Sequence, residues 1–89
     1  AAEIRKQLSP ISNAIKKIEQ KMATTDQALE KIEASLGDNT LYDPTNKDKL
    51  QQLLLQQGNL KQEKERDEGR WFDLTEQLET LQDELASQD

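Results

Sequence analysis

The chain has 89 residues, of which 33% are hydrophobic, 34% are charged and only 3% are aromatic, and its net charge is −6. A chain of this length forms a single domain, and one so poor in apolar side chains is not expected to form a compact globular core. Two arrangements remain, disorder or long helices that bury a narrow seam, and the periodicity of the apolar residues decides between them.

Apolar residues recur in the first half of the chain at alternating spacings of four and three, the pattern of a heptad repeat. They are Ile4, Leu8, Ile11, Ile15, Ile18, Met22, Leu29, Ile32 and Leu36, and Thr25 fills the one gap in the series. The pattern predicts a long helix with one apolar stripe. Ser9 and Pro10 suit an N-cap and the first helical position. We therefore expect a helix over about 9–36, kinked or started at Ser9-Pro10, with residues 2–8 as a short extension.

The end of this helix is predicted at Leu36, the last residue of the stripe. Gly37 follows it and suits the left-handed position that ends many helices. Asp43 before Pro44 offers an N-cap carboxylate followed by a proline at the first helical position. A capping box formed by residues 45 and 48 is a competing start. The loop is thus expected over 37–43.

Leu41 and Tyr42 are apolar residues within this otherwise polar loop. We expect both side chains to fold back and close the end of the seam. A connection this short makes the two helices antiparallel neighbours.

The second half of the chain repeats the alternation of three and four and predicts a helix over about 44–87. Its stripe comprises Leu50, Leu53, Gln57, Leu60, Lys64, Asp67, Trp71, Leu74, Leu78, Leu81 and Leu85. Three central members are polar, and Gly58 and Gly69 flank them, so residues 57–69 are predicted to be the softest part of this helix. Asp67 is expected to pair with Lys17 or Lys21 of the first helix.

The fold class predicted from these elements is all-α, a two-helix antiparallel coiled-coil hairpin that forms one domain over residues 1–89. In this register Leu36 lies opposite Leu50, and Ile15 lies opposite Trp71. Charge favours the same pairing, because residues 1–25 hold five basic and two acidic side chains while residues 71–89 hold six acidic and no basic ones. The thin seam is compatible with a monomer or a weak homodimer.

Several kinds of chemistry are excluded by the residues themselves. Cysteine and histidine are absent, which excludes disulfides, imidazole bases and the usual zinc sites. No glycine-rich phosphate loop is present, and the carboxylates are expected on exposed helix faces. We expect no catalytic residue, no metal site and no cofactor site. The longest apolar run, residues 53–55, is far too short to cross a bilayer. No apolar segment of a signal peptide follows the N-terminus, so we expect a soluble, cytoplasmic protein. The chain begins with Ala-Ala instead of Met, so we expect it to be a piece of a larger protein.

One set of cations is a candidate contact face for nucleic-acid phosphates, which need only spaced positive charges. The set comprises Lys16, Lys17, Lys21, Lys64, Arg66 and Arg70. The alternative interpretation is an ordinary solvated face, because acidic residues alternate with these cations between residues 63 and 68. Trp71 is interpreted as a seam residue packed against Ile15, rather than as an exposed aromatic that binds a ligand.

The order of these features resembles the C-terminal coiled-coil domain of ABC-F ATP-binding proteins, of the Uup and YheS type. The resemblance covers about residues 5–81. It is carried by Leu8-Ser9-Pro10 leading into Ile15-Lys16-Lys17-Ile18-Glu19, by Leu36-Gly37-Asp38, by Leu41-Tyr42-Asp43-Pro44, by the leucines from Leu50 to Leu60 and by Arg70-Trp71 before Leu74. Family members more often carry Leu and Ala at positions 64 and 67, so tight packing is not expected at the middle of this hairpin.

The resemblance implies that the parent is a cytoplasmic ATPase with two upstream ATP-binding cassettes and no membrane domain. ATP and Mg²⁺ would bind in those cassettes and not in this piece. Such proteins act on the ribosome, and in Uup-like relatives the hairpin is associated with DNA binding. The resemblance therefore implies a non-catalytic interaction module that contacts DNA or ribosomal RNA, the ribosome or its own cassettes. The alternative is a protein-docking or spacer coiled coil without nucleic-acid contact, which can self-associate.

Overall fold

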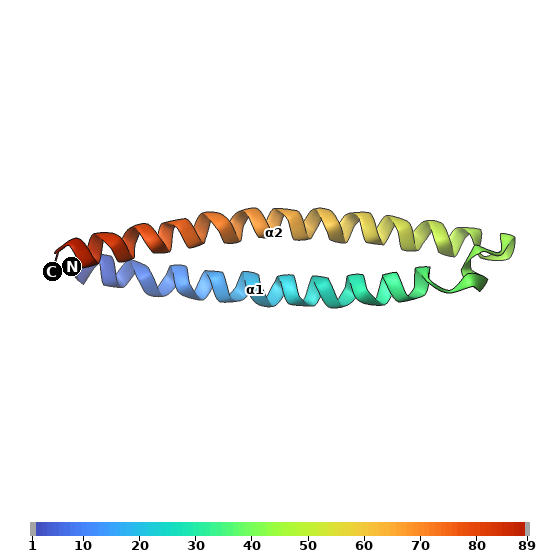
Figure 1. Cartoon of the computed structure of the whole chain (residues 1–89), viewed down its shortest axis with the longest axis horizontal. Coiled ribbons are helices and arrows are strands. Elements are labelled where there is room, and N and C mark those ends of the chain that lie inside the picture. The colour runs from blue at the N-terminus through green and yellow to red at the C-terminus, as the bar shows by residue number, and fades with distance from the viewer. Residues whose placement is uncertain (1, 89) are drawn as a thin grey trace.

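The computed structural model describes residues 2–88, of Gln88 only the backbone, and it consists of two long helices joined by two short helical turns. Helix α1 spans Ala2–Leu36 and helix α2 spans Lys47–Gln88, with the 3₁₀ turns η1 (Asn39–Tyr42) and η2 (Pro44–Asn46) between them. The helices lie side by side and antiparallel, so the start of α1 and the end of α2 meet at the end of the rod opposite η1 and η2 (Figure 1). The molecule measures 67 × 14 × 14 Å. The predicted all-α hairpin is confirmed.

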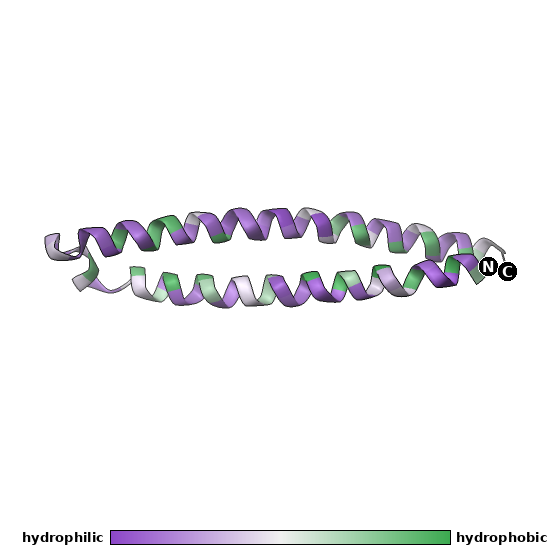
Figure 2. Cartoon of the chain, turned by 180° about the vertical axis from the view of Figure 1, so that it is seen from behind, coloured by the Kyte–Doolittle hydropathy of each residue, from purple (hydrophilic) through white to green (hydrophobic). Residues whose placement is uncertain are grey.

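The seam between the helices is formed by the predicted heptad positions. Every predicted seam residue is buried or half-buried, and the most enclosed are Ile18, Thr25, Leu29, Ile32 and Asp67. Figure 2 shows apolar bands along both helices, with a mostly hydrophilic middle of α2. Two helices cover only one side of each other, and no large side chain of residues 2–88 is fully buried. The seam is therefore best enclosed at the middle of the rod and in α1, and most seam residues of α2 stay only half-buried.

Helix α1 passes through Pro10 instead of beginning there. A start at Ser9-Pro10, one of the two expected alternatives, is thus excluded. Proline removes one backbone hydrogen bond from a helix. Upstream of it, however, Ile4 is buried and Leu8 is half-buried, and burial of an aliphatic side chain contributes about 1.5–3 kcal/mol. This contribution offsets the missing bond and extends α1 back to Ala2.

The turn that leaves α1 differs from the expected glycine turn. Gly37 does not adopt a left-handed conformation, since no residue of 2–88 has a positive φ. Its backbone N–H still bonds to the carbonyls of Glu33 and Ala34, at 3.1 and 3.3 Å. The chain turns one residue later, where Asp38 is extended and its carboxylate accepts hydrogen bonds from the backbone N–H and the hydroxyl of Thr40, at 3.0 and 2.9 Å. Both bonds hold the pKa of Asp38 below its ordinary value of 3.8, and the bond from the backbone N–H has the larger effect.

Asp43 does not cap α2 as predicted. It precedes η2 with an extended backbone and makes no side-chain capping bond, and α2 begins at Lys47 instead of Pro44. Pro44 fixes the first residue of a 3₁₀ turn, closed by a 2.9 Å bond from the Asn46 N–H to the Asp43 carbonyl. The capping function therefore belongs to Asp38 at the first turn of the connection.

Leu41 and Tyr42 behave differently from each other. Leu41 is buried at 5% exposure, which confirms that it closes the end of the seam, whereas Tyr42 is 59% exposed. Its ring does not fill the seam. Its hydroxyl donates a 2.7 Å hydrogen bond to the carbonyl of Leu36 and so satisfies one of the free carbonyls at the end of α1.

Replacing Gly58 and Gly69 by alanine is expected to stabilise the hairpin. A Cβ atom at either position would meet nothing within 4 Å. The gain comes from helix propensity, about 0.5–1 kcal/mol per site, or a few degrees in the unfolding midpoint. Circular dichroism measures the midpoint, and amide exchange of residues 57–69 should slow.

Gly37→Ala is the matched control, because its Cβ would lie only 3.4 Å from the carbonyl oxygen of Ala34. No gain is expected there. An equal rise of the unfolding midpoint at all three glycines would show that the gain does not depend on a helical position with open space for the Cβ atom.

Candidate nucleic-acid interface

Two cross-helix ion-pair groups lie at the middle of the hairpin. The ammonium of Lys21 lies 3.3 Å from Glu63 and 3.5 Å from Asp67, and that of Lys64 lies 2.7 Å from Asp26. The expected pairing of Asp67 with α1 is confirmed, with Lys21 as its partner. All three contacts join one helix to the other, so they define how the two helices are aligned.

Asp67 is the most unusual residue of the seam. It is only 3% exposed, and its Oδ1 accepts the hydrogen bond of Lys21 while its buried Oδ2 has no partner. Thr25, also buried, donates its hydroxyl to the Lys21 carbonyl at 3.0 Å and offers Asp67 no proton. A buried carboxylate with one unsatisfied oxygen costs free energy. The polar centre of the seam therefore fixes the alignment of the two helices and adds little to the free energy of unfolding.

The second group lies on the other side of the seam. The hydrogen bond to Asp26, together with the negative charge of that residue, raises the pKa of Lys64 above its ordinary value of 10.5. Lys21 and Asp26 are five residues apart, which is about 140° around a helix at 3.6 residues per turn. The two ion-pair groups thus mark two opposite edges of the hairpin.

We call the edge that carries Lys21 and Glu63 the basic edge, because most of the charged residues along it are cations. Lys17 precedes Lys21 by four residues, while Arg66 and Arg70 follow Glu63 by three and seven. These are the spacings that place helix residues on one stripe. Lys17, Arg66 and Arg70 are all exposed. Four of the six predicted contact residues therefore share this edge.

The other two predicted contact residues lie elsewhere. Lys64 reaches Asp26 on the opposite edge. Lys16 is five residues from Lys21, so it projects about 140° away from it. The structure therefore divides the predicted set of six instead of bringing it together.

Two further cations of the basic edge were missed by the sequence prediction. Lys31 follows Lys17 by two heptads and Lys49 precedes Glu63 by two heptads, and both are exposed. Lys49 also contributes to the lowered pKa of Asp38. Heptad spacing was the signal that would have found them. Over residues 14–35 and 49–73 the basic edge carries six cations, Lys17, Lys21, Lys31, Lys49, Arg66 and Arg70, against the two acids Glu63 and Asp73.

The surface between these cations carries side-chain amides and a shallow groove. Gln56 and Asn59 of α2 border this groove together with Lys31, and Ile32 and Leu60 lie at its floor because Ala28 is too small to cover them. Amide and ammonium groups are both donors that bind phosphate oxygens. This part of the edge thus continues the line of donors between the two groups of cations.

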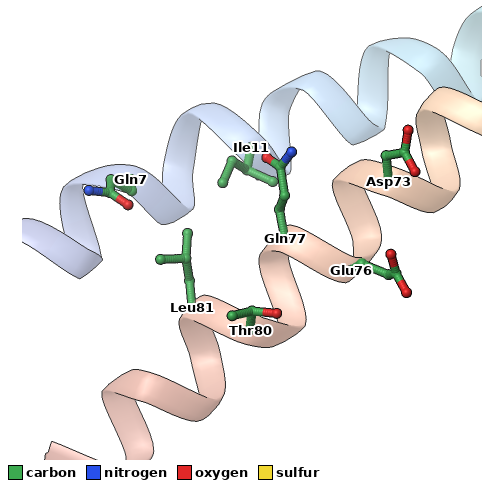
Figure 3. A pocket seen from close by; sticks show the side chains of 7 residues that line it. All are labelled: Gln7, Ile11, Asp73, Glu76, Gln77, Thr80 and Leu81. Atoms are coloured by element: carbon green, nitrogen blue, oxygen red, sulfur yellow. The ribbon is translucent and has the colours of Figure 1, made fainter.

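The basic edge ends toward the free ends of the helices. A second shallow groove there is lined by Gln7, Ile11, Asp73, Glu76, Gln77, Thr80 and Leu81. Figure 3 shows Leu81 and Gln77 directed from α2 toward α1, where Gln7 and Ile11 lie. No cation lines this groove, and two acids border it. The cations of the basic edge are therefore confined to the middle and the connection end of the rod.

Trp71 is half-buried in the seam, as its heptad position predicts. It lies on the edge opposite the cations, where it lines a groove together with Met22 and Phe72. Its predicted opposite residue, Ile15, is half-buried as well.

Comparison with known proteins identifies the family of the chain. The family model described as the ABC transporter C-terminal domain matches residues 12–76, most of the hairpin and its whole connection. The chain belongs to this family, and the predicted resemblance to the C-terminal domain of ABC-type proteins is confirmed. The family is one of small accessory C-terminal domains and is not a catalytic fold. No curated protein and no solved structure matches the chain.

Two structural observations complete this description. Neither helix of residues 2–88 is both long enough and apolar enough to cross a membrane. The same residues contain no group of three or more acidic side chains arranged to hold a metal ion.

Replacing Asp67 by leucine is expected to stabilise the hairpin by about 1 kcal/mol or more, because the change removes a poorly paired buried charge and adds apolar burial. Urea unfolding measures the change in the free energy of unfolding. Asp73→Leu, an exposed site of the same edge, is the control and should change it by less than about 0.5 kcal/mol. A destabilised Asp67→Leu variant would show that the contact with Lys21 outweighs the burial cost.

The Lys64–Asp26 pair is expected to stabilise the hairpin below pH 10.5 and to lose this effect at higher pH. The folded-state pKa of Lys64 is raised, so the contribution is complete below the unfolded value and disappears as the pH rises through the folded value. The difference in unfolding midpoint between the native chain and Asp26→Asn should therefore shrink above pH 10.5. A difference independent of pH would contradict this account.

Proposed function

We propose that this chain is the non-catalytic C-terminal interaction module of an ABC-F ATP-binding protein and that its basic edge contacts nucleic acid, DNA or ribosomal RNA. The observation that carries the proposal is the separation of charge. A chain with a net charge of −6 nevertheless places six cations and two acids on one edge. The family match supports an accessory role in an ABC-type protein.

The geometry of the basic edge suits a phosphate backbone. Lys17 and Lys31 are fourteen residues apart on α1, which is about 21 Å at 1.5 Å per residue. Arg66 and Arg70 of the facing helix lie beside the Lys17–Lys21 part of this line, and their planar guanidinium groups match phosphate oxygens in two-point contacts. A straight rod has no recognition element that enters a groove deeply. We therefore expect contacts with the backbone and little base selectivity.

The ion pairs of the edge set a limit on the number of contacts. Lys21 is held by Glu63 and Asp67, with its side chain 50% exposed. Of the other five cations, Lys49 lies close enough to Asp38 to lower the pKa of that carboxyl, which leaves Lys17, Lys31, Arg66 and Arg70 as free donors among the described residues. About four phosphate contacts would give a steep dependence of affinity on salt, with a logarithmic slope of about −3.6 for duplex DNA.

The rest of the parent protein would supply its chemistry. ATP and Mg²⁺ are expected in two cassettes that precede the hairpin in a cytoplasmic parent, and the hairpin would position nucleic acid relative to them.

The test uses two triple variants that each remove three positive charges. Lys17→Gln, Arg66→Gln and Arg70→Gln together remove charge from the basic edge. Lys16→Gln, Lys47→Gln and Lys61→Gln remove the same charge from exposed positions elsewhere. Titration with duplex DNA and with RNA at low and high salt is expected to show a large loss of affinity, and a salt slope reduced by about 2.7, for the first variant only.

Equal losses in the two variants would place the contact away from the basic edge. Salt-insensitive or undetectable binding by the native chain at low salt would refute nucleic-acid contact through these cations and leave docking or a spacer role.

A further inference from the structure

The edge opposite the cations carries an aromatic groove with acidic borders. Its floor is formed by Met22 and Ala23 of α1 and by Trp71 and Phe72 of α2. Phe72 is 57% exposed, although it is the only phenylalanine in the chain. The small side chain of Ala23 leaves the flank of the seam open beside these rings. The groove is therefore a contiguous apolar surface and not a single exposed residue.

The borders of the groove are negatively charged. Glu19, Asp26 and Glu68 line it from the two helices. Asp26 is occupied by Lys64, whereas Glu19 and Glu68 make no ion pair with any described residue of the hairpin. Glu33 lies two heptads after Glu19 on α1, but Lys61 and Lys64 line the surface there together with Glu33 and Glu68, so the acidic border belongs to the groove itself.

An apolar groove with carboxylates at its borders determines which kind of ligand can bind there. Nucleic acid is repelled by the carboxylates, and a second copy docked through its own acidic edge would oppose like charges. A cationic protein segment satisfies both features. Arginine in particular stacks on Trp and Phe faces while its charge attracts nearby carboxylates.

We propose that this groove binds a basic amphipathic segment of a protein partner, with an apolar or arginine side chain against Trp71 and Phe72 and with lysines or arginines paired to Glu19 and Glu68. The site does not depend on nucleic-acid contact, because it lies on the edge opposite Lys17 and Arg66. A hairpin of this kind joins a basic protein surface on one edge to an anion on the other.

The groove supplies its own reporter, since Trp71 is the only tryptophan of the chain. The probe is a synthetic amphipathic helix of leucine and arginine, compared with a leucine and glutamate helix of the same pattern. The first peptide is expected to shift the emission of Trp71 to shorter wavelength in a saturable, salt-sensitive manner. The second peptide is expected to leave the emission unchanged.

Matched variants locate the contact. Phe72→Ala and the double change Glu19→Gln with Glu68→Gln are each expected to weaken binding about fivefold, because one buried aromatic contact or two exposed ion pairs together contribute about 1 kcal/mol. Leu55→Ala is the control for an exposed apolar residue, at 66% exposure. Glu76→Gln with Glu84→Gln is the control for charge, at exposed positions outside the groove. Both controls should bind as the native chain does.

Three results would overturn the proposal. The first is an equal loss in the Glu76→Gln and Glu84→Gln control, which would reduce the binding to general charge attraction. The second is binding of both peptides, or of neither. The third is sedimentation that shows association of the free chain, abolished by Phe72→Ala, which would assign the groove to a second copy of the chain.

Discussion

The alignment of the two helices depends on the polar contacts at the centre of their seam. A two-helix coiled coil held only by leucines and isoleucines can slide by one heptad with little change in burial. Such a shift would break the ion pairs of Lys21 with Glu63 and Asp67, and that of Lys64 with Asp26. A slipped hairpin would leave the buried Asp67 carboxylate without its cation, at a cost of several kcal/mol. In other coiled coils, polar residues at seam positions fix the register of the helices and lower their stability. Asp67 acts in the same way here, because its buried carboxylate finds a cation in only one alignment.

This register determines what the surface can bind. In an antiparallel pair, the positions that flank the seam on one side of α1 meet the corresponding positions of α2 on the same edge. Lys17 and Lys31 are therefore joined by Arg66 and Arg70 on one edge, while Glu19 and Glu68 meet around Trp71 and Phe72 on the other. A net charge of −6 conceals this separation. Neither proposed role needs a cavity, because charges spaced along a helix would attract both ligand classes.

The hairpin was predictable from the sequence because heptad spacing over more than thirty residues outweighs any local signal. The local signals failed where tertiary contacts opposed them. Pro10 does not start a helix because the seam continues upstream to Ile4, and Asp43 does not cap α2 because η2 intervenes. The six predicted contact residues do not all share one edge, because nearness along the chain grouped Lys16 with Lys17 and Lys64 with Arg66. Which residues share an edge depends on the pairing of two helices, and this requires the structure.

Zero-length carbodiimide cross-linking of the native chain tests this alignment directly, because it joins only amines and carboxylates that are already in contact. Peptide mapping by mass spectrometry should find Lys21 joined to Glu63 or Asp67 and Lys64 joined to Asp26, all within one chain. An equal mixture of isotope-labelled and unlabelled protein separates bonds within a chain from bonds between chains. Cross-links of Lys21 to carboxylates a heptad or more away from residues 63–67, or bonds found only between chains, would contradict the account.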